Sequence, residues 1–550
     1  MEKRLILAIA FSVLIIVTFQ YMFPPPKQTH VQPVTQEPAN QPTSQPANQQ
    51  TSKPANQQTP HHSLRSDAGQ ASEPANQEPP ADEKELIVST DRYIATFSNI
   101  GGAVKKIELK SYKKLKSSEP LVLAEENNPA GYIFSIKDTM DSFALDRAAY
   151  RLDTSGDKIT YTLTAKNFEI TKRYILHKSN NIIELQLIVK NNSSSPADFG
   201  CKIISGSGLV EPRPEDKNLI EASSKVDGKF IGFKRPKNNI ITNPGIVSWA
   251  AIKTRYFSLI MKPYGQTKNQ YYGYTLSGGL FSGIEMEKAS IPANSFAEYK
   301  FILYAGPSIA ADLKRLGMEF EETINYGFFG GIAKALLVVA AFFYRLFHNW
   351  GLSIILLSIF LNIILFPLTL KSFKSMQKMH ELHPQMEKLK AQYKDNPQKL
   401  NKEVLELYKK YKINPLSGCL PLLLQMPIFV ALYQALTKSI DLRGAGFLWI
   451  NDLSMPDAVG IPFALPIFGN SINILPLVMV VLMVLQQKIS SKVMGGAVTE
   501  EQKQQQKMML IIMPIMFGFI FYNMPSGMVL YWVVNTILTI VEQGAILKKA

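Results

Sequence analysis

The residues that could do chemistry in this 550-residue sequence are polar side chains placed inside long apolar runs after residue 330. They are Ser358, Asn362, Gln425, Tyr531, Trp532 and Asn535. Inside a bilayer, such groups could line a hydrated groove that carries polar segments partway across. Alternatively, each could form a helix–helix hydrogen bond, which is common in membrane bundles. Tyr531 and Trp532 could also be interfacial aromatic residues.

Residues for other kinds of chemistry are missing from the sequence. Seven histidines are scattered through tails and loops, and there is no metal-ligand cluster, Walker-type phosphate loop or nucleophile elbow. We therefore expect no metal, no cofactor and no enzymatic reaction. Cys201 lies in an extramembrane segment and Cys419 opens an apolar run, so a disulfide between them is not expected.

Apolar runs predict six membrane-spanning helices that would position the polar side chains. The first, at 1–23, begins with a charged stretch and lacks a small-residue cleavage site, so we interpret it as an uncleaved anchor. The other five belong to a membrane core at 351–545 and are predicted at about 351–370, 418–436, 472–487, 508–524 and 526–541.

The placement of charge predicts the orientation of these helices. Residues 371–412 contain eleven Lys and five acidic residues, which marks them as cytoplasmic. If the N-terminus is cytoplasmic, residues 24–325 lie outside, so an odd number of spans must separate them from residues 371–412. The predicted span at 351–370 is one crossing, and a second crossing within 326–350 would make the number even. We therefore interpret residues 326–350 as an amphipathic helix in the outer interface. Both termini are then cytoplasmic.

Two features of the later spans bear on how the bundle is built. Within the last three predicted spans, the apolar segments 472–485, 508–521 and 528–540 have only 13 or 14 residues, whereas about 20 cross a normal hydrocarbon core. Either polar flanks lengthen these helices or the bilayer is thinner around them. Prolines in or beside the spans predict kinked helices; they are Pro367, Pro421, Pro427, Pro476, Pro514 and Pro525.

The part of the chain before the membrane core predicts a linker and a β domain. Residues 24–85 repeat Pro-Ala-Asn-Gln and are too polar to bury a core, so we expect a disordered linker. Residues 86–325 alternate apolar and polar residues in short runs between Gly and Asn clusters. This pattern predicts an antiparallel β domain with a sandwich architecture. It contains no recognisable catalytic constellation, so we expect binding or scaffolding.

Residues 371–416 predict a cytoplasmic helical hairpin that turns at Asp395-Asn396-Pro397. Much of the net charge of +15 flanks apolar segments, which favours anionic lipids as partners. The hairpin could also dock on RNA or another protein, or be a solvated charged surface without a function. Its candidate docking residues are Lys371, Lys374, Lys378, Lys388, Lys390 and Lys394.

Three long stretches resemble signatures of the YidC family of membrane protein insertases. They are residues 414–429 (NPLSGCLPLLLQMPIF), 447–454 (FLWINDLS) and 525–532 (PSGMVLYW). In the outer domain, Gly101-Gly102 followed by Leu109 and Tyr112 looks like the opening of the periplasmic domain of Gram-negative members. The resemblance covers nearly the whole chain except the linker.

This resemblance implies a multi-domain α + β protein of the bacterial inner membrane, with a periplasmic β-supersandwich and a five-helix core. The core would hold a hydrophilic groove open to the cytoplasm and to lipid. The implied partners are nascent inner-membrane proteins, the Sec translocon, and ribosomes with signal recognition particle. Met426, Pro427 and Ile428 match positions along which substrates slide, although a lipid-facing surface would have the same composition.

The sequence departs from the family pattern at Asn362. Many relatives carry an intramembrane Arg here, five residues before the proline that corresponds to Pro367. Asn offers hydrogen bonds but no charge. A fixed cation that attracts acidic tails therefore cannot be carried over to this chain, and a groove would work by hydration and hydrogen bonding. A small-solute transporter or channel is the alternative function, but we find no inverted repeat among the spans and no charge at the centre of a span.

Overall fold

The computed structural model describes residues 83–549 apart from short gaps at 114–117, 141–142, 156–157, 211–218, 234–239, 266–267, 277–278, 395, 412–419, 466–468 and 494–499. The described residues lie within one compact unit, 74–550. The predicted anchor at 1–23, most of the linker at 24–85 and part of the first family signature lie outside the described residues.

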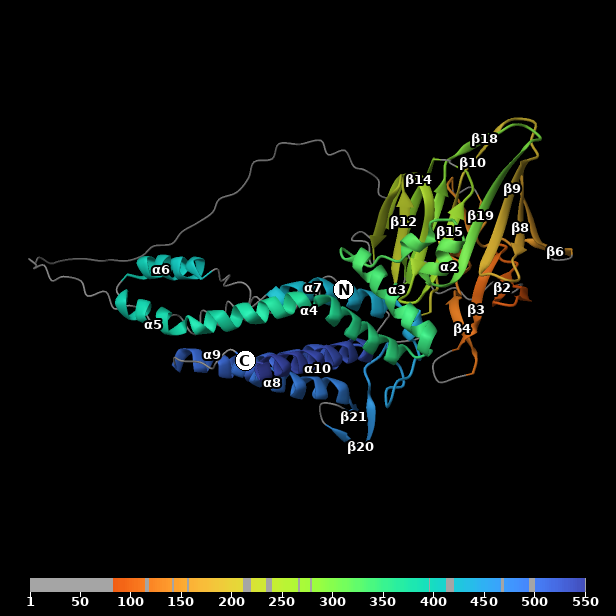
Figure 1. The fold of residues 1–550 in the computed structure, drawn as a ribbon. Coiled ribbons are helices and arrows are strands. Elements are labelled where there is room, and N and C mark those ends of the chain that lie inside the picture. Colours follow the sequence, from red (N-terminus) through yellow and green to blue (C-terminus); the bar gives the residue numbers. More distant parts are fainter. Residues whose placement is uncertain are drawn as a thin grey trace, which may run out of the picture. The chain divides into compact units, whose positions relative to one another are not determined.

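The described part of the chain begins with a four-stranded antiparallel sheet in the order β1-β2-β3-β4. Figure 1 labels its strands β2, β3 and β4. Its strands are β1 (Glu85–Ser89), β2 (Tyr93–Ser98), β3 (Ala103–Lys113) and β4 (Pro120–Glu125), and a short 3-10 helix, η1 (Pro129–Gly131), follows. Between β2 and β3, the Gly101-Gly102 turn has positive φ at both residues, which glycine adopts without strain.

A second, 13-stranded antiparallel sheet has the order β5-β11-β17-β16-β14-β15-β19-β9-β8-β7-β6, with β12 and β13 joined to it through β14. Its strands are β5 (Ile136–Asp138), β6 (Arg151–Ser155), β7 (Lys158–Ala165), β8 (Phe168–Leu176), β9 (Ile182–Asn191), β11 (Cys201–Gly206), β12 (Glu221–Val226), β13 (Lys229–Phe233), β14 (Ile240–Lys253), β15 (Phe257–Pro263), β16 (Lys268–Leu276), β17 (Gly279–Met286) and β19 (Phe296–Pro307). A separate pair joins β10 (Ala197–Phe199) to β18 (Ala289–Ile291).

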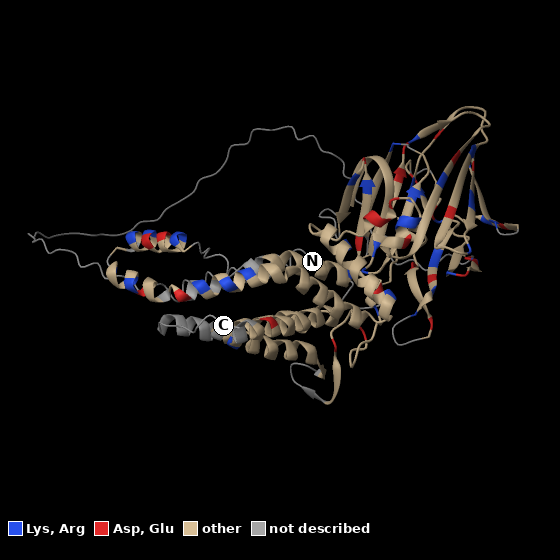
Figure 2. Cartoon of the chain, in the orientation of Figure 1, with Lys and Arg blue, Asp and Glu red and all other residues tan. Residues whose placement is uncertain are grey.

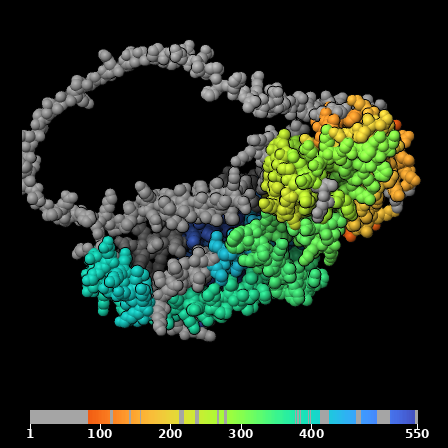
Figure 3. Space-filling view, turned by 90° about the horizontal axis from the view of Figure 1, so that it is seen from above, coloured from red at the N-terminus to blue at the C-terminus, as the bar shows by residue number. Residues whose placement is uncertain are grey.

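The long strand β14 turns this sheet into a sandwich because it changes partners along its length. Residues 240–246 pair with β16, whereas residues 250–253 pair with β15. Buried side chains from both parts, such as Tyr271 and Leu259, belong to one hydrophobic core. Figure 3 shows the outer face of this domain in the space-filling view. The predicted antiparallel β-sandwich is confirmed.

A buried lysine holds the Gly101-Gly102 turn against the core. Lys172 is on β8, where the inward positions alternate with outward ones, and it is fully buried. Its Nζ donates to the carbonyl oxygens of Gly101 and Phe134, each at 2.7 Å. Burial lowers the pKa of Lys172 to about 7, because the low-dielectric core disfavours the charged form.

Helices make up most of the chain after the sandwich. The short ones are α2 (Ala310–Arg315), η3 (Phe320–Thr323) and η5 (Ile440–Leu442). The longer ones are α3 (Gly330–Phe347), α4 (Trp350–Glu381), α5 (His383–Gln392), α6 (Pro397–Lys410), α7 (Leu420–Lys438), α8 (Ile474–Val493), α9 (Glu500–Tyr522) and α10 (Ser526–Lys549). A hairpin of β20 (Val459–Leu465) and β21 (Gly469–Ile472) precedes α8. In the bundle, α10 packs on α8 and α4, and α3 packs on α4 and α7.

Several helices are long and apolar enough to cross a membrane. Among the described residues, these are Gly330–Phe347, Trp350–Ser375, Ile474–Ser491 and Ser526–Ala545, with a shorter apolar stretch at Leu510–Tyr522. The helices α8, α9 and α10 have 20, 23 and 24 residues, so polar flanks lengthen the short apolar segments to about 30 Å or more. Helix length alone therefore does not require a thinner bilayer.

Only three of the six prolines lie in the interior of a helix. Pro367, Pro427 and Pro514 are inside α4, α7 and α9, where each removes an intrahelical hydrogen bond. Pro421, Pro476 and Pro525 lie in a first turn or just before it. The amide groups of a first turn have no intrahelical acceptor, so proline is tolerated there.

Candidate functional site

The candidate site is built on one face of α10. Tyr531 and Asn535 are four residues apart on this helix, so their side chains lie on the same face, one turn apart. Tyr531 is almost completely buried and its Oη accepts a hydrogen bond of 2.6 Å from Nε2 of Gln425 on α7. Asn535 is half-buried and its Oδ1 accepts a bond of 3.2 Å from Nδ2 of Asn362 on α4. We call these four residues the polar ladder.

The polar ladder carries no formal charge. The predicted spans at 351–370, 418–436, 472–487, 508–524 and 526–541 contain no Asp, Glu, Lys or Arg. An Asn side chain has two N–H donors and a carbonyl oxygen with two lone pairs. The bond between Asn362 and Asn535 uses one donor and one lone pair, so each amide keeps capacity for a further hydrogen bond. Both side chains are partly exposed, so another group can reach them.

The other predicted groove residues have different surroundings. Ser358 lies one turn before Asn362 on α4, is buried, and donates to the carbonyl oxygen of Ile354 in its own helix at 2.8 Å. Trp532 is half-buried among three phenylalanines. Its ring centroid lies 5.3 Å from that of Phe429, 5.5 Å from that of Phe517 and 5.1 Å from that of Phe521. Trp532 therefore packs α10 against α7 and α9, and the structure does not bring Ser358 to the polar ladder.

The predicted slide residues follow Gln425 on α7. Met426 is 39% exposed, while Pro427 and Ile428 are half-buried. Because Pro427 has no N–H, the carbonyl group of Leu423, four residues before it, lacks its usual helical donor. Pro427 therefore removes one intrahelical hydrogen bond of α7 close in sequence to Gln425.

The predicted docking lysines are all exposed, on two helices and the turn after them. Lys371, Lys374 and Lys378 lie on the last part of α4, which continues to Glu381, and Lys388 and Lys390 lie on α5. Figure 2 shows basic residues along this stretch, with a few acidic residues among them. Helices α5 and α6 pack as a hairpin through bonds from Gln385 Nε2 to Tyr411 Oη at 3.1 Å and from Tyr408 Oη to Met386 Sδ at 3.4 Å. Lys394 follows α5 in the turn.

Comparison with known proteins identifies the family. The family model described as 60Kd inner membrane protein matches residues 342–550, and the model described as YidC periplasmic domain matches residues 85–339. The membrane protein insertase YidC of Geotalea daltonii is 32% identical over 570 residues, which cover 100% of this chain and 99% of that protein. The chain belongs to the YidC family of membrane protein insertases.

Other YidC proteins are similar over comparable lengths. The membrane protein insertase YidC of Citrifermentans bemidjiense is 33% identical over 560 residues, which cover 99% of this chain and 98% of that protein. The crystal structure of YidC from Thermotoga maritima has 15% sequence identity and a TM-score of 0.29, and covers 84% of this chain and 97% of that chain. The predicted insertase function is confirmed, with an inner-membrane helical region and a periplasmic domain.

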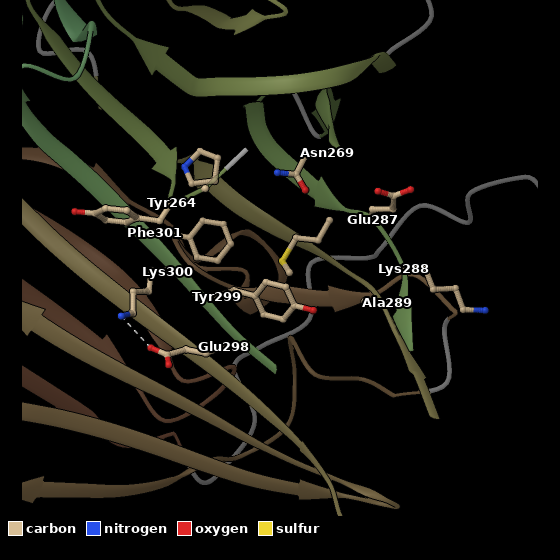
Figure 4. A pocket seen from close by; sticks show the side chains of 12 residues that line it. Tyr264, Asn269, Glu287, Lys288, Ala289, Glu298, Tyr299, Lys300 and Phe301 are labelled. Atoms are coloured by element: carbon tan, nitrogen blue, oxygen red, sulfur yellow. Dashed lines mark ion pairs between the residues drawn. The ribbon is translucent and has the colours of Figure 1, made fainter. Parts of the chain in front are cut away.

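The periplasmic domain has a cavity of about 490 Å³ between the ends of β15 and β19 on one side and β16 and β17 on the other (Figure 4). Met286 and Phe301 are buried and form an apolar floor, while Glu298 and Lys300 form an ion pair of 3.3 Å at the rim. An apolar floor with a polar rim is the usual composition of a small binding site.

Sequence reasoning missed two residues that hold the start of α8. Asp457 is buried and accepts hydrogen bonds from the backbone N–H of Leu475 and from Nε1 of Trp449. Asn473 donates from Nδ2 to the carbonyl oxygen of Tyr522 at 2.7 Å. An Asn directly before an apolar run is a helix-start signal, so Asn473 could have been found. The sequence holds no comparable signal for Asp457.

Proposed function

We propose that this chain inserts nascent inner-membrane proteins by passing their polar flanks along a hydrophilic groove that contains the polar ladder. The observation that carries the proposal is the pair of neutral cross-helix hydrogen bonds on one face of α10, which joins α4 and α7. Met426, Pro427 and Ile428 form the apolar side along which the substrate helix slides. Ser358 and Trp532 border the groove without joining the polar ladder: Ser358 bonds within α4 one turn before Asn362, and Trp532 fixes α10 against α7 and α9.

Such a groove lowers the free-energy cost of moving the substrate's polar flank across the bilayer, whereas the apolar helix needs no such help. Moving an apolar helix out of water is favourable by itself. A charged side chain at the centre of a bilayer costs about 2.5–3.5 kcal/mol on insertion scales. Amide and hydroxyl groups that can accept a substrate's hydrogen bonds replace part of the lost hydration and lower this cost.

The proposed topology has six spans and both termini in the cytoplasm. An anchor at 1–23 and the helices α4, α7, α8, α9 and α10 would cross the membrane. The helix α3 is long and apolar enough to cross, yet a crossing there would leave the Lys-rich end of α4 outside, against the positive-inside rule. We therefore place α3 in the periplasmic interface. The linker at 24–85, the periplasmic domain at 86–325, the interfacial segment at 326–350, the hairpin at 371–416 and the core at 351–545 complete the organisation.

The proposed partners follow from the same arrangement. Nascent inner-membrane proteins are the substrates, delivered by ribosomes with signal recognition particle and received alone or together with the Sec translocon. The exposed lysines of α4 and α5 suit phosphate groups of RNA or of anionic lipids, because both carry negative charge.

Reconstitution of the purified full chain in vesicles tests this proposal. A two-span substrate synthesised in the presence of these vesicles should have its translocated loop protected from protease. The double variant Asn362→Leu, Asn535→Leu should insert it more slowly, by about tenfold if the amides remove 1.4 kcal/mol of the barrier. The control is Ile363→Leu, at the neighbouring position, where the side chain is 66% exposed and makes no part of the polar ladder.

The possible outcomes separate the function from the site. Protection no greater than in vesicles without the protein would exclude insertion by this chain alone. Normal insertion by the double leucine variant would leave the function intact and would remove the polar ladder from the mechanism. A loss that is equal in the control variant would indicate general damage to the bundle.

A further inference from the structure

A tight turn between α7 and α8 presents two large apolar side chains at its tip. The backbone N–H of Phe447 donates to the carbonyl oxygen of Ile450 at 2.8 Å, and the N–H of Ile450 donates back to that of Phe447 at 2.9 Å. The two residues between them, Leu448 and Trp449, are 77% and 43% exposed. We call residues 447–450 the tip turn. No charged residue occurs from Gly444 to Asn451.

The backbone of the tip turn is strained at Leu448, and the exposed side chain of this residue gains no burial energy that would offset the strain. Leu448 has φ of +52°, in the left-handed region that favours glycine or asparagine. This conformation costs a residue with a Cβ about 1–2 kcal/mol. Burying a leucine side chain contributes about 1.5–3 kcal/mol, but an exposed leucine gains none of this. An apolar surrounding for Leu448 would therefore offset the strain.

The tip turn is fixed to the bundle at two places, so its direction is set. The ring of Phe447 lies where a Cβ on Gly351 would be, at the start of α4. Nε1 of Trp449 donates to Oδ2 of Asp457 at 3.2 Å, and the same oxygen accepts from the N–H of Leu475 at 2.9 Å in the first turn of α8. Trp449 is thus tied to the start of a helix.

The segment after the tip turn is attached to α10 as well. The backbone N–H of Gly527 donates to the carbonyl oxygen of Leu453 at 2.9 Å, and that of Ser526 donates to Met455 at 2.7 Å. The loop therefore contacts the first turns of α4, α8 and α10. These three helices start at the same end of the bundle, which is the periplasmic end in the topology proposed above.

The neighbouring surface of α8 shows what surrounds the tip turn. Leu477 and Val478 are 50% and 39% exposed on the helix that Asp457 caps, and the apolar exposure continues to Val481 at 67%. On a membrane helix, these side chains face lipid acyl chains. The tip turn extends this apolar surface past the end of the helix, to the level at which Trp is enriched in membrane proteins.

We propose that the tip turn inserts into the periplasmic leaflet of the bilayer, with Leu448 among the acyl chains and Trp449 at the headgroup boundary. The occupant of this surface is phospholipid. A protein partner fits less well, because two side chains on a one-turn tip supply far less than the roughly 1,000 Å² that a stable protein interface buries. The role of the turn is to fix the depth of α4, α8 and α10 in the membrane.

Lipid-depth quenching of Trp449 tests the proposal on the full chain in phospholipid vesicles. The other three tryptophans, Trp249, Trp350 and Trp532, are replaced by phenylalanine. Lipids brominated near the carbonyl end of their chains should lower the emission about twofold, and lipids brominated near the methyl end should lower it less. Emission typical of water without quenching by either lipid would overturn the proposal.

The variant Leu448→Asn separates the lipid contact from the shape of the turn. Asn adopts positive φ readily, so the turn and the thermal stability in detergent should be kept or improved. Quenching of Trp449 should nevertheless fall, because the apolar anchor is gone. Unchanged quenching in this variant would show that Leu448 does not hold the turn in lipid.

A second measurement covers the case in which the single-tryptophan protein does not fold. A cysteine at position 448, in a chain whose only change elsewhere is Cys419→Ser, can carry an environment-sensitive fluorophore, since Cys201 is buried. Strong quenching of this fluorophore by spin-labelled lipid supports insertion. Quenching only by a water-soluble agent excludes it.

Discussion

Replacing Asn362 by arginine is expected to make insertion depend on the charge of the substrate's tail. In the wild-type chain, the polar ladder is neutral, and the five predicted spans of the core contain no charged residue. Two substrates that differ only by Glu→Gln changes in the translocated tail should then differ only by the intrinsic cost of moving the charge. The variant Asn362→Arg adds an attraction that the wild-type chain lacks.

The size of this attraction follows from the distance and the local dielectric. Two unit charges at 4 Å interact by about 1 kcal/mol in bulk water and by about 4 kcal/mol at an effective dielectric constant of 20. A partly hydrated groove lies between these limits. Since 1.36 kcal/mol corresponds to a factor of ten, the ratio of acidic-tail to neutral-tail insertion should rise by at least about fivefold over that of the wild-type chain.

The assay compares initial rates of loop protection for the two substrates in vesicles that contain either protein. The variant should stay folded, because the side chain at position 362 is only half-buried and arginine can extend its charged group toward water. An unchanged ratio in a folded, active variant would refute the reasoning that the tail passes Asn362. Loss of insertion for both substrates would show that Asn362 instead packs α4 against α10.

Three further predictions concern stability of the full chain in detergent. Burial lowers the pKa of Lys172 from its ordinary value of 10.5 to about 7. Between these pH values the unfolded chain binds more protons than the folded chain, so the free energy of unfolding should rise with pH, by roughly 4–5 kcal/mol at most. Lys172→Met should remove this pH dependence from thermal unfolding curves. Gly351→Ala should cost about 1–3 kcal/mol because the new Cβ overlaps the ring of Phe447, and a double-mutant cycle should show a smaller cost, but not zero, in a Phe447→Ala background, because Cβ of Phe447 itself lies 2.5 Å from the new atom. Tyr531→Phe and Gln425→Leu should each cost about 0.6 kcal/mol in unfolding free energy, and the double variant no more than either, because both remove one hydrogen bond.

The sequence predicts the elements of this fold well where burial imposes a period. Strands such as β8 alternate inward and outward side chains, and this pattern is visible without the structure. The membrane helices appear as apolar runs for the same reason, although their ends do not, because α9 begins at Glu500 within a polar stretch. The apolar run marks the part of a helix that lies in lipid, whereas the helix itself continues as far as its backbone hydrogen bonds do.

The contacts that define the candidate site were not predictable from the sequence. Asn362 and Asn535 are 173 residues apart, and the choice between a hydrogen bond to a neighbouring helix and an unpaired polar group depends on how α4 and α10 pack. Lys172 is a second example, because lysine is ordinarily exposed and its burial on β8 depends on two carbonyl acceptors that the sequence does not reveal. The strained backbone of Leu448 carries no signal, because leucine is rare at positive φ.

The strength of the polar ladder bears on how an insertase of this kind can work without an energy source. A hydrogen bond between membrane helices contributes on average about 0.6 kcal/mol, which is close to thermal energy. The bond between Asn362 and Asn535 can therefore open and exchange its partner for a passing polar group at little cost. A fixed cation would capture an acidic tail more strongly but would also hold it, because the same attraction must be overcome for release. A neutral ladder weakens capture and release together, so the net driving force comes from burial of the substrate's apolar helix.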